Sequence, residues 1–218
     1  MRVFAKPVHP LKNRNDVTRV AEFLRDNYEY GDVFRILFLT GCNTGLRAGD
    51  LRNLRKKDFD NNFFDIVEQK TGKSRRIFIN AALRAALNEF FENPQFHDNG
   101  ETQTINFFFH RPDDYVFIGN RGTSIGVKYI HYLIREACRE LNIRGNFGSH
   151  TMRKTFAFHC FKLCGDINRV KAILRHTDVK LTIKYVHDRR SLKRLYYSSE
   201  GNIETELTVK ECYDVNLI

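Results

Sequence analysis

The stretch G-S-H-T-M-R-K-T-F at residues 148–156, followed by L-R-H-T-D-V-K-L-T-I-K-Y at residues 174–185, decides the fold. Its first part has helical periodicity, and Ser149 stands where an N-cap is expected. Because residues three apart share a helix face, His150 and Arg153 can point at one anion beside the positive end of the helix dipole. H-x-x-R alone also fits a solvated helix face, so the interpretation depends on the rest of the chain.

Length and charge bound the class of protein. The chain has 218 residues, enough for one sizeable core with appendages. Its net charge of +10 and pI of about 9.5 predict a polyanionic partner, with nucleic acid ahead of an anionic membrane surface. No stretch approaches the length of an apolar membrane span, and the N-terminus lacks a signal peptide's apolar run. We therefore expect a cytoplasmic protein of prokaryotic, viral or mobile-element origin, with no membrane partner.

The cysteines predict free thiols. They are odd in number and form no C-x-x-C pair: Cys42, Cys138, Cys160, Cys164 and Cys212. Cys160 and Cys164, with His159 beside them, are conceivable metal ligands. They fall in an apolar helical run and lack partner ligands, which favours small buried hydrophobic residues and predicts no metal site.

The first part of the chain is predicted to be irregular and then helical. Residues 1–15 lack a pattern, and a helix capped by Asp16 is expected to end before Gly31. The run Val33–Thr40 is apolar apart from one arginine, which is typical of a buried helix, and it leads into a glycine-rich turn at residues 41–45.

A basic segment follows that turn, beginning T-G-L-R-A-G-D-L at residues 44–51. A short helix here would place Arg47 and Asp50 on one face, so that the carboxylate orients the guanidinium. A surface ion pair of little energetic value is the alternative. Arg52 and Lys56 continue the basic run.

A hairpin is predicted next. Residues 63–68 and 76–79 are predicted to be two strands, and Q-K-T-G-K-S-R at residues 69–75 is predicted to be the tip between them. The tip is basic and contains no acid, which fits a finger on a DNA backbone. An edge strand protected by charge is the alternative.

The remainder alternates helices with loops. Helices are predicted at residues 81–91, 127–141, 168–174 and 179–186. The polar segment 92–114 is expected to be a long loop whose Phe107–Phe109 we cannot place, and Tyr115–Ile118 a short strand. Gly165 should end the helix of the opening stretch. In the tail, alternating apolar residues at 203–209 indicate a strand or docking segment.

Taken together, the motifs resemble the catalytic domain of the tyrosine recombinases, which include the phage integrases. The motifs are T-G-L-R-A-G-D-L, Q-K-T-G-K, H-T-M-R-K-T and L-R-H with a tyrosine nine residues after the histidine. The resemblance runs over residues 16–190. It implies a mostly helical α+β fold with a small antiparallel β-hairpin at one edge. It further implies one catalytic domain across the chain, with an irregular segment 1–15 and a tail 191–218 that docks on a neighbouring subunit. No separate N-terminal DNA-clamp domain is expected, so the chain is either minimal or a fragment.

The resemblance assigns a role to each residue of the motifs. Tyr185 would attack the scissile phosphate and form a 3′-phosphotyrosine. Arg47 and Arg153 would clamp the non-bridging oxygens. His150 would accept the tyrosine proton or position the phosphate, and His176 would hydrogen-bond a phosphate oxygen.

The hairpin supplies the acid in this assignment. Lys70 would protonate the leaving 5′-oxygen, with Lys73 as a competitor for that role, and Asp50 would orient Arg47. The family's usual glycine before the second histidine is Arg175 here, which adopts positive φ less readily if the position requires it. DNA contacts are further expected from Arg52, Lys56, Lys73, Arg75, Arg76, Lys154 and Arg175.

The chemistry agrees with these roles. Attack on a phosphodiester builds charge on its equatorial oxygens, and preorganised cations lower that barrier. Arginine suits the task because its planar fork meets two oxygens at once. Two arginines, a lysine and two histidines can supply what a metal otherwise would, so we expect no cofactor, no metal and no ATP.

The sequence therefore predicts a site-specific DNA recombinase. It would act as a homotetramer on double-stranded DNA and be monomeric or weakly associated without it. A catalytically inactive DNA-binding module of the same fold is the alternative, although the complete set of catalytic residue types argues against it. A topoisomerase-like or telomere-resolving enzyme is disfavoured by the short chain.

Overall fold

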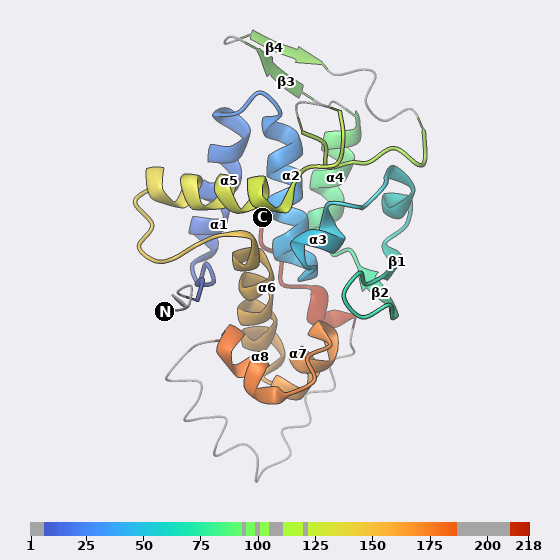
Figure 1. Cartoon of the computed structure of the whole chain (residues 1–218), viewed down its shortest axis with the longest axis vertical. Coiled ribbons are helices and arrows are strands. Elements are labelled where there is room, and N and C mark those ends of the chain that lie inside the picture. The colour runs from blue at the N-terminus through green and yellow to red at the C-terminus, as the bar shows by residue number, and fades with distance from the viewer. Residues whose placement is uncertain (1–6, 93–94, 99–100, 105–110, 120–121, 187–209) are drawn as a thin grey trace, which may run out of the picture.

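The computed structural model describes residues 7–92, 95–98, 101–104, 111–119, 122–186 and 210–218. In chain order the elements are α1 (Arg14–Asp26), α2 (Gly31–Thr44), α3 (Ala48–Leu51), the 3₁₀ helix η1 (Lys56–Phe59), β1 (Phe63–Val67), β2 (Ser74–Phe78), α4 (Ala81–Glu92), β3 (Gln95–Asp98), β4 (Glu101–Thr104), α5 (Val127–Glu140), α6 (Ser149–Cys164), α7 (Ile167–Leu174), α8 (Val179–Val186) and the 3₁₀ helix η2 (Glu211–Tyr213) (Figure 1). The mostly helical α+β prediction is confirmed.

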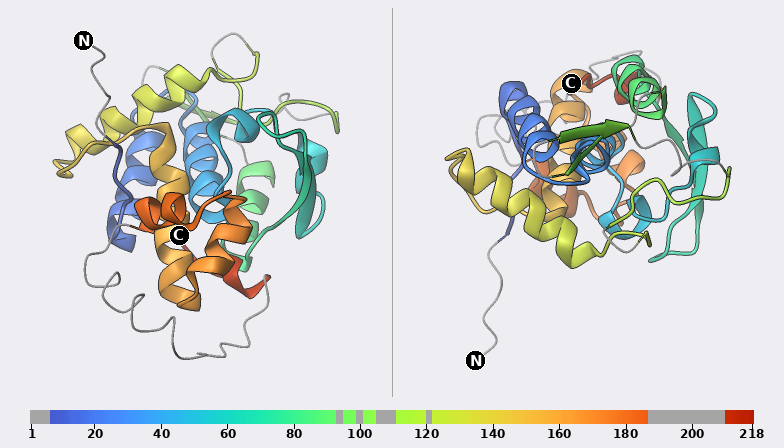
Figure 2. Two further views of the ribbon diagram at one scale, coloured as in Figure 1. Left: turned by 60° about the horizontal axis from the view of Figure 1, so that its bottom comes forward. Right: turned by 90° about the horizontal axis from the view of Figure 1, so that it is seen from above.

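Helices α2 and α6 form the centre of the molecule. Nearly every residue of α2 is buried, as expected for a largely apolar helix, and most of α6 is buried although it carries several charged or polar side chains. Helix α2 packs against α1, α4 and α6, and α6 also packs against α5, α7 and α8. Two views from other directions show the β1–β2 hairpin at one edge of this helical body, as predicted (Figure 2).

The close approach of α2 and α6 explains why α2 is longer than predicted. It continues through Gly41 to Thr44. Glycine at position 41 serves close packing, since a Cβ there would lie 2.5 Å from Sδ of Met152 on α6. The helix ends at Gly45, which adopts the left-handed conformation with φ of 65°. A Cβ there would lie 2.4 Å from the Phe156 ring.

Other boundaries differ slightly from the expectations. Helix α1 starts two residues before Asp16, and Asn13 is its N-cap, with a side chain that accepts from the Asn15 backbone N–H. Helix α6 includes Ser149, and Gly148 takes the N-cap position. Gly165, with φ of 68°, ends α6 as predicted.

The hairpin prediction is confirmed, and a second hairpin was missed. Strands β1 and β2 pair antiparallel from Phe63 opposite Phe78 to Val67 opposite Ser74. The expected loop 92–114 contains the antiparallel pair β3–β4, whereas Phe107–Phe109 lie outside the described residues. The expected strand Tyr115–Ile118 is wrong, since its two ends form only isolated bridges.

The last nine residues pack against their own chain. Cys212, Tyr213, Val215 and Leu217 are buried. The Leu217 backbone N–H donates to Asn43 Oδ1 at 3.1 Å, and Asn80 Nδ2 donates to the Tyr213 carbonyl at 2.9 Å. These contacts lie within one chain, and the docking of the tail on a neighbouring subunit stays a prediction. Residues 187–209, including the alternating stretch 203–209, are outside the described residues. Within the described parts, no helix is long and apolar enough to cross a bilayer.

Candidate active site

One pocket gathers all six residues that the sequence singled out as catalytic. Its volume is about 590 Å³, and its lining includes Arg47, Lys70, His150, Arg153, His176 and Tyr185. These side chains come from the α2–α3 turn, the hairpin tip, the start of α6, the α7–α8 loop and α8. The structure thus brings together segments that are up to 138 residues apart (185 − 47).

Arg153 is held by the ends of two helices. Its side chain is almost fully buried, with 1% of the residue exposed. Nη1 donates to the carbonyl of Gly45 and Nη2 to the carbonyl of Leu174, each at 2.6 Å. These carbonyls lie at the C-terminal ends of α2 and α7, where backbone acceptors lack helical partners and a cation is favoured. Burial and the charges of Arg47 and Arg75 lower the pKa of Arg153, but the group remains charged at neutral pH.

Arg47 is held by side-chain carboxylates. Its Nη1 lies 3.0 Å from Oε2 of Glu68 and 3.9 Å from Oδ2 of Asp50. Asp50 uses its other oxygen, Oδ1, to accept from the backbone N–H of Gln69 at 2.9 Å. Asp50 therefore joins the hairpin to α3, and Glu68 is the nearer partner of Arg47.

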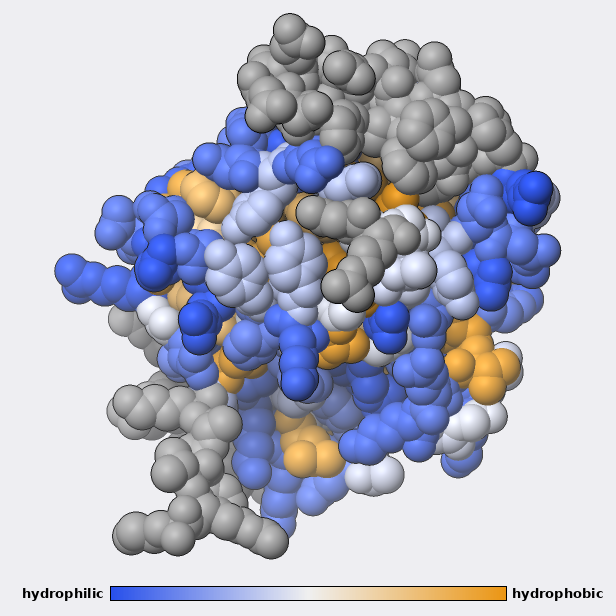
Figure 3. Space-filling model, turned by 45° about the horizontal axis from the view of Figure 1, so that its top comes forward, coloured by the Kyte–Doolittle hydropathy of each residue, from blue (hydrophilic) through white to orange (hydrophobic). Residues whose placement is uncertain are grey.

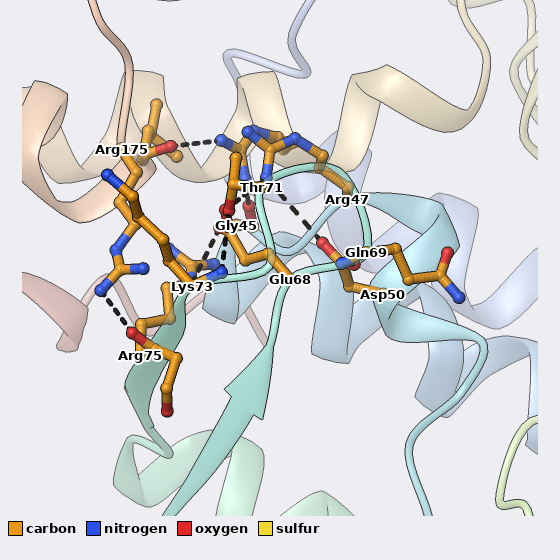
Figure 4. A network of polar contacts seen from close by, with 12 residues as sticks. Gly45, Arg47, Asp50, Glu68, Gln69, Thr71, Lys73, Arg75 and Arg175 are labelled. Carbon is orange, nitrogen blue, oxygen red and sulfur yellow. Dashed lines mark hydrogen bonds and ion pairs between the residues drawn. The ribbon is translucent and has the colours of Figure 1, made fainter.

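Glu68 was missed by the sequence analysis. It is fully buried between Arg47 and Arg75, behind the hairpin turn (Figure 4). Burial opposes its charge, but hydrogen bonds from Thr71 and Arg47 outweigh that cost and hold the pKa of Glu68 below its usual value. Strand alternation was the available signal, because Glu68 lies four residues after Phe64 and shares its inward face.

Two of the residues predicted to contact DNA are buried. Arg75 is 7% exposed, with Nε 3.4 Å from Oε1 of Glu68 and Nη1 donating to the Ile173 carbonyl. It shares the inward face of β2 with Ile77, so it joins the hairpin to α7. Lys154 is also 7% exposed and donates to the Val8 carbonyl at 2.8 Å. Its Nζ lies 5.2 Å from the ring centre of Tyr185, inside the protein.

The remaining predicted DNA contacts lie at or near the surface. Lys73 is exposed at the hairpin tip beside Lys70, but only Lys70 lines the pocket. Arg76 is exposed and paired with Asp65 at 2.9 Å. Arg52 donates to the Ser124 carbonyl at 3.0 Å and so anchors the segment that precedes α5. Lys56 is half-buried outside the pocket. One face of the molecule shows mostly polar side chains, with apolar groups scattered among them (Figure 3).

Arg175 adopts the conformation that the sequence analysis expected of a glycine. It is the C-cap of α7, with φ of 51° and ψ of 45°. Its Nη2 donates to the Ser74 carbonyl at 2.5 Å, which ties the loop to the hairpin. Its buried Nη1 has no hydrogen-bond partner among the described residues, and the residue lines the pocket.

His176 is set as a neutral imidazole beside Tyr185. Its Nδ1 lies 3.0 Å from the Thr182 hydroxyl oxygen. Its ring meets the Tyr185 ring edge to face, with centroids 4.7 Å apart. Burial, followed by the charges of Arg153 and Arg47, lowers the pKa of His176 to about 4. The imidazole is therefore uncharged at neutral pH.

His150 and Tyr185 complete the pocket within one chain. His150 lies in the first turn of α6. Desolvation by the surrounding protein, followed by the charges of Arg153 and Lys154, lowers the pKa of His150. Tyr185 is half-buried on α8 and faces the pocket of its own chain. Among the described residues, the one group of three potential metal ligands is Cys160, Cys164 and Cys212, which lies outside this pocket.

Comparison with known proteins places the fold and the family. Residues 15–191 match the model of the phage integrase family. The chain is 26% identical over 198 residues to the probable integrase/recombinase YoeC of Bacillus subtilis, covering 90% of this chain and 98% of that protein. It is 25% identical to tyrosine recombinase XerC of Bacillus pumilus over 71% of this chain and 50% of XerC.

Solved structures share the fold. XerA recombinase superposes with a TM-score of 0.66 and 21% identity, over 93% of this chain and 66% of XerA. The catalytic domain of bacteriophage HP1 integrase superposes with a TM-score of 0.54 and 19% identity, over 93% of this chain and all of that domain. XerH in a post-cleavage complex with difH substrate superposes with a TM-score of 0.65 and 19% identity, over 89% of this chain and 53% of XerH. The chain thus spans about half to two thirds of the Xer proteins.

Proposed function

The chain belongs to the phage integrase family, and from that premise we propose that it is a site-specific DNA recombinase that works through a 3′-phosphotyrosine. The observation that carries the proposal is the convergence of a tyrosine, two arginines, a lysine and two histidines on one pocket. With Arg175, the pocket collects four cationic side chains. A site of this charge fits a phosphodiester.

The two arginines are suited to the phosphate. Arg153 is fixed by two backbone carbonyls and Arg47 by Glu68, so neither guanidinium needs to reorganise as the reaction proceeds. Their remaining N–H donors serve the non-bridging oxygens, where charge builds up during attack. Such preorganisation lowers the barrier because the donors are already aimed at the oxygens on which charge develops.

The proton transfers are assigned to the uncharged histidine and the hairpin lysine. His150, whose pKa is lowered, is neutral and accepts the proton of the Tyr185 hydroxyl as its oxygen attacks phosphorus. Lys70 on the hairpin tip gives a proton to the leaving 5′-oxygen. His176 uses Nδ1 towards Thr182, which leaves Nε2–H to donate to a phosphate oxygen in the matching tautomer.

The same reaction run backwards rejoins strands. The phosphotyrosine conserves the energy of the phosphodiester bond, so a free 5′-hydroxyl can displace the tyrosine without ATP. Double-stranded DNA as the partner is supported by the net charge of +10 and by a fold shared with XerH in complex with difH. Assembly of four copies on two duplexes belongs to the same proposal.

Covalent trapping tests the proposal. The protein is incubated with a pool of nicked duplexes of randomised sequence, in which a short fragment diffuses away after cleavage. Denaturing electrophoresis then separates protein–DNA adducts, and sequencing of the trapped DNA gives the site. We expect adducts with the wild type and with Tyr132→Phe, an exposed tyrosine outside the pocket, and none with Tyr185→Phe. Adducts that persist in Tyr185→Phe would refute the nucleophile.

A further inference from the structure

A cluster of three thiols lies on the far half of the helix that carries His150 and Arg153. Cys160 and Cys164 are one turn apart on α6, and Cys212 comes from η2 near the end of the chain. All three sulfur atoms lie within 4.8 Å of one another, and all three residues are buried. The third ligand that the sequence did not reveal is therefore present, 48 residues after Cys164 (212 − 164).

The spacing of the sulfurs fits a metal ion more closely than chance packing of small hydrophobic residues. With metal–sulfur bonds of about 2.3 Å, thiolates around one ion lie roughly 3.8 Å apart. The cluster needs to contract by no more than about 1 Å to reach that arrangement. Cys160 and Cys164 share one helix face, so their positions are fixed before η2 docks.

A positive charge lies beside the three sulfur atoms. Arg169 on α7 hydrogen-bonds Cys212 and adds a positive charge beside it. Three thiolates and a mono- or divalent cation leave a net negative charge that the guanidinium offsets.

We propose that Cys160, Cys164 and Cys212 bind one d¹⁰ cation, Zn²⁺ or Cu⁺, through three thiolates. Binding breaks three S–H bonds, forms three metal–sulfur bonds and releases three protons to solvent. Thiolate sulfur is the ligand type that both ions prefer. The bound ion joins η2 to α6, and so fixes the C-terminal segment 210–218 on its own chain.

This connection reaches the active-site side of the core. Tyr213, next to Cys212, packs against Phe156 of α6 with ring centroids 5.3 Å apart and against Phe78 of β2 at 5.7 Å. Removal of the ion should therefore loosen the last residues first, and leave Arg153 anchored by its two carbonyls.

Metal titration of the reduced, metal-free full chain tests the proposal. Co²⁺ serves as the spectroscopic probe for the Zn²⁺ arm, since thiolate ligation gives a near-ultraviolet charge-transfer band. Cu⁺ is delivered from a chromogenic chelator in the other arm. We expect one equivalent in one arm or both, a rise in Tm on binding, and at least tenfold weaker binding in Cys212→Ser.

The control separates this site from other thiols. Cys138→Ser removes a buried cysteine elsewhere and should bind as the wild type does. Circular dichroism checks that each variant is folded, and Cys164→Ser replaces Cys212→Ser if the latter is not. Equal binding by the variants and the wild type, or no thiolate band and no Cu⁺ transfer, would overturn the proposal. A disulfide within the trio in protein isolated without reductant would also overturn it.

Discussion

The two sides of the pocket hold their arginines in different ways. On the α6 side, Arg153 is anchored by the carbonyls of Gly45 and Leu174, which belong to the backbone and cannot be removed by a side-chain substitution. On the hairpin side, Arg47 is anchored by Glu68, a buried side chain that also pairs with Arg75. The α6 side is thus fixed by the fold itself, whereas the hairpin side depends on one carboxylate.

The largest effect is expected on the α6 side. Arg153→Ala removes a phosphate donor and leaves two buried carbonyls without partners. We expect adduct formation to fall about 10²- to 10³-fold, and the free energy of unfolding to fall by about 2 kcal/mol. Arg153→Lys keeps a charge but loses the planar fork, so it should rescue stability more than rate. Single-turnover cleavage measures the rate, and urea unfolding measures the free energy of unfolding. Full activity of Arg153→Lys would contradict this account.

Glu68→Gln tests the hairpin side. It leaves Arg47 and Arg75 without their shared counter-charge, and breaking a buried pair costs about 3 kcal/mol. Asp50→Asn is the matched control, because its side-chain carbonyl still accepts from the Gln69 N–H; we expect a loss of about 1 kcal/mol or less. If thermal unfolding ranks the two variants the other way, then Asp50 is the principal anchor of Arg47.

Substitution of the two lysines of the hairpin tip distinguishes protonation of the leaving oxygen from electrostatic binding of DNA. Lys70→Ala should slow cleavage of an ordinary phosphodiester about 10²-fold. A 5′-bridging phosphorothiolate, whose sulfur leaves without protonation, should restore the rate. Lys73→Ala should change only the salt dependence of DNA binding, by roughly one unit of slope. A phosphorothiolate rescue of Lys73→Ala instead of Lys70→Ala would exchange their roles.

A smaller effect is expected from pH. The folded-state pKa of His176 is about 4, below the usual 6.5, so the unfolded chain binds a proton that the folded chain does not. This contribution to stability is complete above pH 6.5 and is lost as the pH falls towards 4. His176→Gln should therefore show a shallower decline in Tm across this window than the wild type. Parallel curves would show that His176 is not buried as a neutral ring.

The sequence predicted most helices and the β1–β2 hairpin because each depends on local pattern, whereas the residues of the pocket came from the resemblance to a known family. Helix periodicity, the glycine at 165 and strand alternation are visible within a few residues. The role of Arg153 as a link between two helix ends was not visible, since it depends on where Gly45 and Leu174 meet in space. The burial of Arg75 and Lys154 was not predicted, because nothing local shows that Glu68 and the Val8 carbonyl are their partners.

The C-terminal segment was the hardest part to predict. Its apolar residues indicated docking, but the pattern carries no information on whether the partner is the same chain or another. The contacts of Leu217 with Asn43 and of Tyr213 with Asn80 join distant parts of one chain, which no local pattern shows. The same holds for Cys212, which meets its two partner thiols across 48 residues of chain.

The most direct test of the central claim is to locate the DNA on the protein. The trapped adduct is digested with nuclease and protease, and the modified peptide is sequenced by mass spectrometry. The account predicts a nucleotide attached through its 3′-phosphate to Tyr185. Attachment to another residue, or through a 5′-phosphate, would contradict it.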